Sequence, residues 1–151
     1  MKGVGELLRR TPVGRLGLSF KDEPYVIPLN FLYTGGKIYF HTSQSGRKIE
    51  YLMANSRVCF EVDEFLGIEE GKTPCSCSTY YRSVIATGEA KIISKFDEKR
   101  EILRKLLRKY TKRPYRIDLE KEKIDRTNII EVSIKEVTGK ERLPPIRKMG
   151  L

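Results

Sequence analysis

The residue types best suited to chemistry lie together in the segment His41-Thr42-Ser43-Gln44-Ser45-Gly46-Arg47-Lys48. This segment follows an alternating apolar run and precedes apolar residues that recur at helical spacing. The pattern predicts a strand over 37–42, a polar turn, and a helix over 45–54. Hydroxyl groups, a glycine and two cations at a helix start can bind phosphate, because free amides and the helix dipole point at the same place. The alternative is an ordinary helix start, with Ser45 as N-cap and both cations in solvent.

Length and composition indicate a globular protein. The chain has 151 residues, of which 39% are hydrophobic and 33% are charged, which fits one domain over residues 1–151 with a core of its own. We expect no membrane span, because no apolar run approaches about 20 residues. The first residues also lack the apolar centre of a signal peptide. A cytoplasmic protein is the expectation.

The cysteines argue against a disulfide framework and against a metal site. There are three of them, and Cys75 and Cys77 are separated by a single residue, which suits a reducing compartment. Zinc sites usually space their cysteines by two or more residues, and only His41 could join Cys59 as a further soft ligand. We therefore expect no bound metal.

The charge distribution weakens a nucleic-acid interpretation of the net charge of +10. Residues 1–90 carry 11 Lys and Arg against 10 Asp and Glu, whereas residues 91–151 carry 19 against 10. The C-terminal excess is interleaved with acids on a helix and in a predicted loop over 121–126, which is typical of a solvated surface. We do not expect nucleic acid to be the partner. Abundant Lys, Arg, Glu and Ile with a single Gln are compatible with a thermophilic source.

Hydrophobic periodicity predicts a mainly β fold. A short polar helix opens the chain, and a glycine pair at Gly35-Gly36 makes a hairpin turn. Ser94 with Asp97 resembles a capping box that starts a helix ending near Tyr110. Residues 65–79 are predicted to be a loop, and Gly88 a bulge. The predicted strands are 13–20, 24–33, 37–42, 57–64, 80–93 and 128–138. Six mostly antiparallel strands with peripheral helices predict a small β-barrel whose ends the helices cover.

Four motifs in this order resemble a known family. They are Pro24-Tyr25-Val26-Ile27-Pro28-Leu29-Asn30-Phe31, Gly36-Lys37-Ile38-Tyr39-Phe40-His41, Gly46-Arg47-Lys48, and Tyr81-Arg82-Ser83-Val84-Ile85-Ala86-Thr87-Gly88-Glu89-Ala90. Together they are similar to the FMN-binding split barrel of the pyridoxamine 5'-phosphate oxidase-like superfamily, and most similar to its nitroimidazole-resistance branch. The resemblance covers nearly the whole chain. It implies a homodimer with two flavin sites at the subunit interface.

The resemblance also implies roles for particular residues. Those implied to bind FMN are Pro28, Leu29, Asn30, His41, Thr42, Ser43, Arg47, Lys48, Arg82 and Ser83. The ring would lie against Pro28-Leu29-Asn30, and Lys48 and Arg82 would face the phosphate. His41 is the candidate proton donor, since its ordinary pKa is about 6.5. The alternatives are a polar strand residue for Asn30, a surface arginine for Arg82 and a structural imidazole for His41.

The function implied is an FMN-dependent oxidoreductase that passes electrons from a reduced nicotinamide to a small acceptor, which could be a nitroaromatic compound. Pyridoxamine-phosphate oxidase activity itself is not expected, because that enzyme's C-terminal arginine and histidine motif is missing after His41. Some members of the superfamily bind F420 or haem, and the single phosphate site implied here favours FMN. The alternatives are a flavin-binding or sensing protein without turnover, an F420-binding reductase and, more distantly, a basic nucleic-acid-binding barrel.

Overall fold

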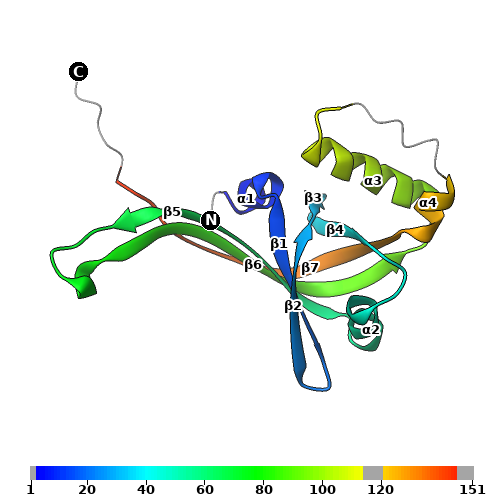
Figure 1. The fold of residues 1–151 in the computed structure, drawn as a ribbon, viewed down its shortest axis with the longest axis horizontal. Helices are drawn as coiled ribbons and strands as arrows, with labels where there is room; N and C mark the ends of the chain where they lie inside the picture. The colour runs from blue at the N-terminus through cyan, green and yellow to red at the C-terminus, as the bar shows by residue number, and fades with distance from the viewer. Residues whose placement is uncertain (1–2, 114–120, 146–151) are drawn as a thin grey trace.

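One antiparallel sheet organises the chain in a computed structural model that describes residues 3–113 and 121–145. Its strand order is β2-β1-β5-β6-β7-β4-β3, so β2 and β3 are the two edges (Figure 1). The elements in chain order are α1 Val4–Arg10, β1 Val13–Phe20, β2 Glu23–Asn30, β3 Leu32–Thr34, β4 Lys37–Thr42, α2 Arg47–Ala54, β5 Arg57–Glu69, the 3-10 helix η1 Pro74–Ser76, β6 Ser78–Ile93, α3 Phe96–Tyr110, α4 Lys121–Arg126 and β7 Asn128–Arg142. The predicted class, mainly β with peripheral helices, is confirmed.

The expected number of strands is wrong, because the predicted strand over 24–33 is two strands. β2 pairs with β1 up to Asn30, and β3 begins at Leu32 and pairs with β4. Between them the side chain of Phe31 is fully buried and packs edge-on against Phe60, with the ring centroids 4.8 Å apart. Burial of this ring turns the chain from one edge of the sheet to the other, and the described residues therefore form seven strands in one sheet.

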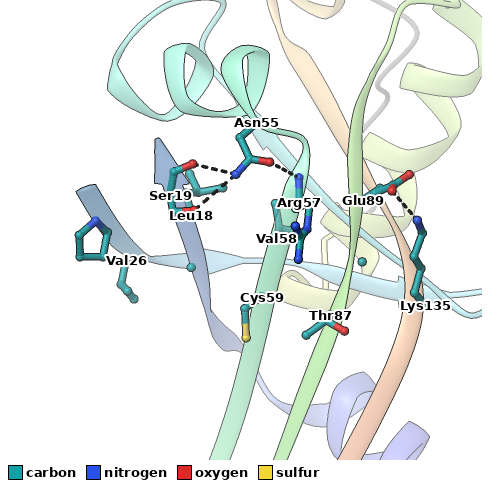
Figure 2. A pocket seen from close by; sticks show the side chains of 13 residues that line it. Leu18, Ser19, Val26, Asn55, Arg57, Val58, Cys59, Thr87, Glu89 and Lys135 are labelled. Atoms are coloured by element: carbon teal, nitrogen blue, oxygen red, sulfur yellow. Dashed lines mark hydrogen bonds and ion pairs between the residues drawn. The ribbon is translucent and has the colours of Figure 1, made fainter. Parts of the chain in front are cut away.

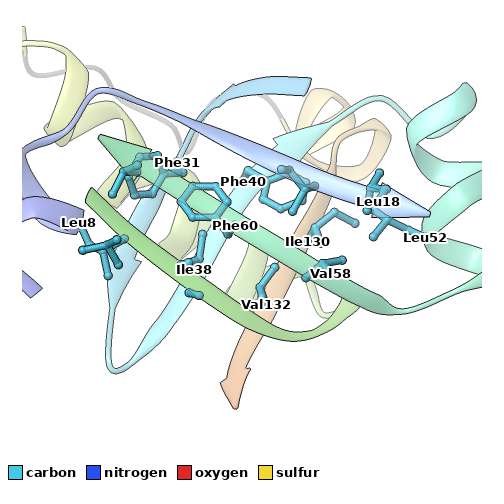
Figure 3. Packing of buried hydrophobic residues seen from close by; sticks show 14 of the residues in the cluster. Leu8, Leu18, Phe31, Ile38, Phe40, Leu52, Val58, Phe60, Ile130 and Val132 are labelled. Carbon is cyan, nitrogen blue, oxygen red and sulfur yellow. The ribbon is translucent and has the colours of Figure 1, made fainter. Parts of the chain in front are cut away.

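Alternating apolar residues on the inner face of the sheet make the core. On β5 the buried positions are Val58, Phe60 and Val62, and they meet residues from β1, β4 and β7 (Figure 3). Gly14 is required opposite Phe60, because a Cβ atom there would lie 2.1 Å from the ring. The predicted alternation of β5 is confirmed, and it fixes which face of each strand is left outside.

The outer halves of β5, β6 and β7 extend away from the rest of the molecule (Figure 1). We call residues 63–85 and 137–142 the arm. The loop predicted over 65–79 is wrong at both ends, because β5 continues to Glu69 and β6 begins at Ser78. Strand β7 is likewise longer than predicted. The predicted bulge at Gly88 is confirmed by a register shift between Thr87 and Gly88, where an added Cβ would lie 2.2 Å from Ser133 O.

The helices pack apolar side chains against parts of the sheet, but two predicted caps are wrong. Helix α2 has Gly46 as N-cap instead of Ser45, and α3 starts after Lys95 with no side-chain cap, so Ser94 makes no capping box. Residues 121–126, predicted to be a loop, form α4, which the buried Lys99 of α3 contacts through Asp125 O at 3.0 Å. Within residues 3–113 and 121–145, no helix has the length and apolar character needed to cross a bilayer.

Candidate functional site

The segment 41–48, which the sequence predicts to bind phosphate, lies at the end of β4 and the start of α2. Thr42 ends β4, is buried, and pairs with Asn128 of β7. In the turn, the Ser43 hydroxyl donates to Ser45 O at 2.7 Å. Gly46 has a φ of 111°, which only glycine adopts without strain. The first hydrogen bond of the helix is from the Ile49 amide to Gly46 O, at 2.9 Å, so the amides of the two preceding residues are available to an anion.

Lys48 is the more buried of the two cations in this segment. Its side chain is half-buried, and its ammonium lies 5.9 Å from the centroid of the Phe40 ring. Burial lowers the pKa of Lys48, because the charged form loses hydration. No carboxylate of the described residues forms an ion pair with it. A desolvated ammonium beside a helix N-terminus fits a phosphate group, which would restore the lost stabilisation.

His41 lies beside Lys48 and shares its electrostatic environment. The residue reaches the surface at the end of β4. Packing around its ring lowers the pKa of His41, and the positive charge of Lys48 lowers it further. An imidazole in this environment is neutral at pH 7, and an anion bound at Lys48 would raise its pKa. The arrangement can therefore move a proton next to a bound anion.

Arg47 already has partners on α2 and β2. Its guanidinium donates to the Tyr51 hydroxyl at 3.0 Å and lies 4.7 Å from the centroid of the Tyr25 ring. These contacts join the first turn of α2 to the middle of β2. The predicted role of Arg47 in cofactor binding stays a prediction, and its observed contacts position the helix start against the strand.

The predicted ring-binding residues lie on β2, at an edge of the sheet. Pro28 and Asn30 are exposed on one face, whereas Leu29 packs against the core from the other. Proline is compatible with this edge because its missing N–H costs no ladder hydrogen bond there. β3 pairs only with residues 37–39 of β4, so residues 40–42 also have one unpaired edge. A planar ligand with polar edges could hydrogen-bond to both unpaired edges.

Arg82 and Ser83 lie in the arm. The Nε atom of Arg82 is 3.3 Å from a Glu141 carboxylate oxygen, yet it is buried and makes no hydrogen bond. The Glu141 carboxylate balances the charge of Arg82 without forming a hydrogen bond to this Nε–H, so the guanidinium can still bind an anion such as a phosphate. The residues present thus fit a phosphate at two places, near Lys48 and near Arg82.

A single chain does not bring these two places together. Thr42 pairs with Asn128, and Ser83 pairs with Lys140, twelve residues further along β7. A strand rises about 3.3 Å per residue, so about 40 Å of strand separates them. One phosphate cannot contact both Lys48 and Arg82 of the same chain.

Sequence reasoning missed a hollow on the outer face of the sheet (Figure 2). Its volume is about 610 Å³, and none of the predicted site residues lines it. Gly17, which lies between the buried Leu16 and Leu18 of β1 and lines the hollow, provided a signal in the sequence, because glycine on an outward strand position leaves space. The described residues contain no group of three or more His, Cys, Asp or Glu side chains placed to hold a metal ion.

The fold defines a class of protein with one antiparallel sheet and peripheral helices, in which the start of α2 carries the residues predicted to bind an anion. The chain belongs to the pyridoxamine 5'-phosphate oxidase family, whose model matches residues 3–141.

Solved structures agree with this assignment. The chain is 27% identical, with a TM-score of 0.77, to a candidate 5-nitroimidazole antibiotic resistance protein from Bacteroides thetaiotaomicron, over 90% of this chain and 80% of that one. It is 26% identical, with a TM-score of 0.82, to the flavocytochrome Anf3 from Azotobacter vinelandii, over 96% and 68%. It is 25% identical, with a TM-score of 0.65, to an FAD-binding protein from Mesorhizobium loti, over 91% of each chain.

A curated relative is an uncharacterized protein of Rhizobium meliloti (strain 1021), 26% identical over 76 residues. The match covers 50% of this chain and spans less than half, 43%, of that relative. The resemblance to flavin-binding split barrels that the four motifs predict is confirmed by the family and by the solved structures.

Proposed function

We propose that this protein is an FMN-binding oxidoreductase that works as a homodimer. The observation that carries the proposal is the pair of incomplete anion sites, one at Lys48 and one at Arg82, in a single chain. A second copy would supply Arg82 and Ser83 to the phosphate held at the start of α2. When bound, FMN would supply the transfer of electrons from a reduced nicotinamide to a small acceptor, with nitroaromatic compounds as the first class to test.

The remaining site residues have distinct tasks. Thr42 and Ser43, beside His41, would contact the ribityl chain and the ring. Pro28, Leu29 and Asn30 would present the β2 edge to the ring, and His41 would donate a proton to the acceptor. Support for a flavin comes from the family and from relatives that bind FAD or are flavocytochromes. A single phosphate site at each interface favours FMN over FAD, since the dinucleotide carries two phosphates.

Apolar side chains of the arm support the second copy. Phe65 is 65% exposed and Ile68 is 55% exposed, and Ile85, which the strand register places on the same face of the arm, is also exposed. Soluble monomers rarely expose apolar side chains that gather on one element, and such patches mark interaction sites. An arm covered by a second chain would bury these residues and bring its Arg82 to the partner's α2.

Two substitutions test the phosphate site. Lys48→Ala and Arg82→Ala should each weaken FMN binding by roughly 10- to 100-fold, the range for hydrogen bonds to charged groups, while riboflavin affinity changes little. Fluorescence titration of the apoprotein measures both. Lys135→Ala is the control, because Lys135 is an exposed β7 cation paired with Glu89 that lies outside both the arm and the start of α2. Comparing FMN with FAD in the same titration decides between the two cofactors.

A mixed dimer of these variants tests sharing between chains. One subunit carries Lys48→Ala and the other carries Arg82→Ala. If each site takes Lys48 from one chain and Arg82 from the other, the mixed dimer has one site with both residues and should bind one FMN with the parent's affinity. Weak binding at both of its sites would mean that no phosphate is shared between chains. Anaerobic bleaching of the flavin by NADH or NADPH then tests the oxidoreductase activity.

A further inference from the structure

The break between β2 and β3 is held by the last two residues of α3. Tyr110 receives a hydrogen bond from the Phe31 amide at 2.8 Å, and its hydroxyl lies 2.9 Å from Phe31 O and 2.7 Å from Pro12 O. The Lys109 ammonium donates to Phe31 O at 2.9 Å and lies 3.8 Å from the centroid of the Phe31 ring. The backbone that leaves the sheet at Phe31 thus finds its partners on a helix 78 residues later.

The same cluster fixes the side chain of Asn30. Its Nδ2 atom donates to Pro12 O at 3.1 Å. The Tyr110 hydroxyl donates to the same Pro12 carbonyl at 2.7 Å, so the two side chains meet at one acceptor. The nitrogen side of the Asn30 amide therefore faces Pro12 and Tyr110. The carbonyl oxygen, on the other side of the planar amide, is left for a ligand, and the residue is exposed.

We infer that Tyr110 is a positioning residue that holds Asn30 as a hydrogen-bond acceptor, so that Asn30 recognises a ring N–H of the bound cofactor. This inference rests on the proposed FMN function. The isoalloxazine ring carries one such donor between two carbonyl groups, the imide N3–H. An amide free to turn could meet either a donor or a carbonyl, whereas one held by Pro12 and Tyr110 selects the donor. The inference assigns the task of orienting the flavin to a residue on α3 that contacts no cofactor.

N3-methyl FMN is the probe, because it keeps the ring and the phosphate but lacks the N3–H donor. The parent protein should bind it about tenfold more weakly than FMN, which corresponds to the loss of one hydrogen bond. Asn30→Ala should lose this preference and bind the two flavins within about twofold. Tyr110→Phe should reduce the preference at least threefold, since the amide is no longer held from both sides.

Tyr33→Phe is the matched control. Tyr33 is a half-buried tyrosine of the neighbouring β3 whose ring contacts Arg9, and its hydroxyl makes no hydrogen bond within residues 3–113 and 121–145. This variant should keep the full preference for FMN. Hydrogen exchange in the apoprotein gives a readout without flavin. The Phe31 amide should exchange faster in Tyr110→Phe than in the parent, and at the parent's rate in Tyr33→Phe.

The outcomes separate this inference from the proposed function. If the parent binds FMN and N3-methyl FMN equally well, Asn30 is not an acceptor for N3–H, and the FMN function still stands. If Tyr110→Phe keeps the full preference while Asn30→Ala loses it, the positioning role of Tyr110 is wrong. If the parent binds neither flavin, the proposed function fails and the inference fails with it.

Discussion

The 41–48 loop and the arm differ in the kind of group that each leaves unsatisfied. Beside the loop, Ile49 and Leu52 of α2 are packed in the core, and within the loop Lys48 has no carboxylate partner among the described residues. In the arm the two arginines have carboxylate partners, Glu141 for Arg82 and Glu69 for Arg142, and apolar side chains such as Phe65 and Ile68 are exposed. The 41–48 loop would be stabilised by an anion beside Lys48, and the arm would be stabilised by an apolar surface packed against its exposed side chains.

This difference teaches how a small barrel can build a flavin site. A chain of 151 residues fills its interior with its own side chains, so a planar ring must bind on the outside. The 41–48 loop supplies a positive charge but little apolar surface to shield a bound ring from water. The arm supplies that apolar surface together with Arg82. Neither region is a site alone, and a symmetric pair of chains would join each loop to the other chain's arm.

Placing charges on the apolar side chains of the arm should have the largest effect on dimerisation and flavin binding. Phe65→Asp together with Ile68→Asp should weaken dimerisation by about a thousandfold or more, because truncating or charging a buried interface residue typically costs 2 kcal/mol or more. FMN should be released with the subunits, since a ligand that binds only the dimer is linked to it by mass action. Sedimentation at several concentrations, with absorbance at the flavin band, measures both effects.

Met53→Asp is the control for the arm. Met53 is 70% exposed, more than Phe65 or Ile68, but lies on α2 outside the arm. It should leave both dimerisation and flavin content at the parent's level. A parent protein that sediments as a monomer with FMN fully bound would contradict the shared site, whatever the variants do.

Features of the fold that depend on neighbours in sequence could be predicted, whereas features that depend on long-range contacts could not. The β4 strand, the polar turn and α2 depend on neighbours in sequence, so periodicity placed them within a residue or two. The Gly88 bulge was also readable, because glycine inside a strand marks such a position. By contrast, the split of β2 from β3 depends on Phe31 packing against Phe60 and on Tyr110 from α3. No local pattern in residues 24–33 indicates those partners.

The arm shows the same limit for the candidate site. Its strand ends at Glu69 and Ser78 pair with each other across a tip that contains Gly71, Pro74 and Ser76, and residues of these types are typical of a loop. The sequence motif around Arg82 indicated an arginine suited to binding phosphate. Its distance from Lys48 along β7 follows only from strand register, which a single sequence does not give.

Removing the imidazole should affect chemistry more than binding. His41→Ala should slow reduction of a nitroaromatic acceptor by roughly 10²-fold, the usual contribution of one positioned proton donor. FMN affinity should stay near the parent's, because the phosphate contacts are untouched. Stopped-flow oxidation of the reduced flavin separates this step from reduction by the nicotinamide. Added imidazole should restore part of the rate, and an unchanged rate in the variant would leave His41 with a structural role.

The smallest effect tests the coupling inside the 41–48 loop. The pKa of His41 is lowered by burial and by the charge of Lys48, so Lys48→Met should raise it toward its ordinary value. Bound inorganic phosphate should raise the pKa of His41 in the parent, and raise it less in Lys48→Met.

The same shift makes stability depend on pH. Because the pKa of His41 is lower in the folded state than in the unfolded one, the unfolded chain binds more protons at pH values between the two, and this stabilising contribution is lost as the pH falls from the unfolded value to the folded one. NMR titration of the single imidazole measures the pKa directly, and urea unfolding measures the stability. In Lys48→Met the loss of stability over this pH window should therefore shrink. If the pKa of His41 is the same in both proteins, Lys48 does not act on the imidazole, and the loop provides two separate groups instead of one coupled site.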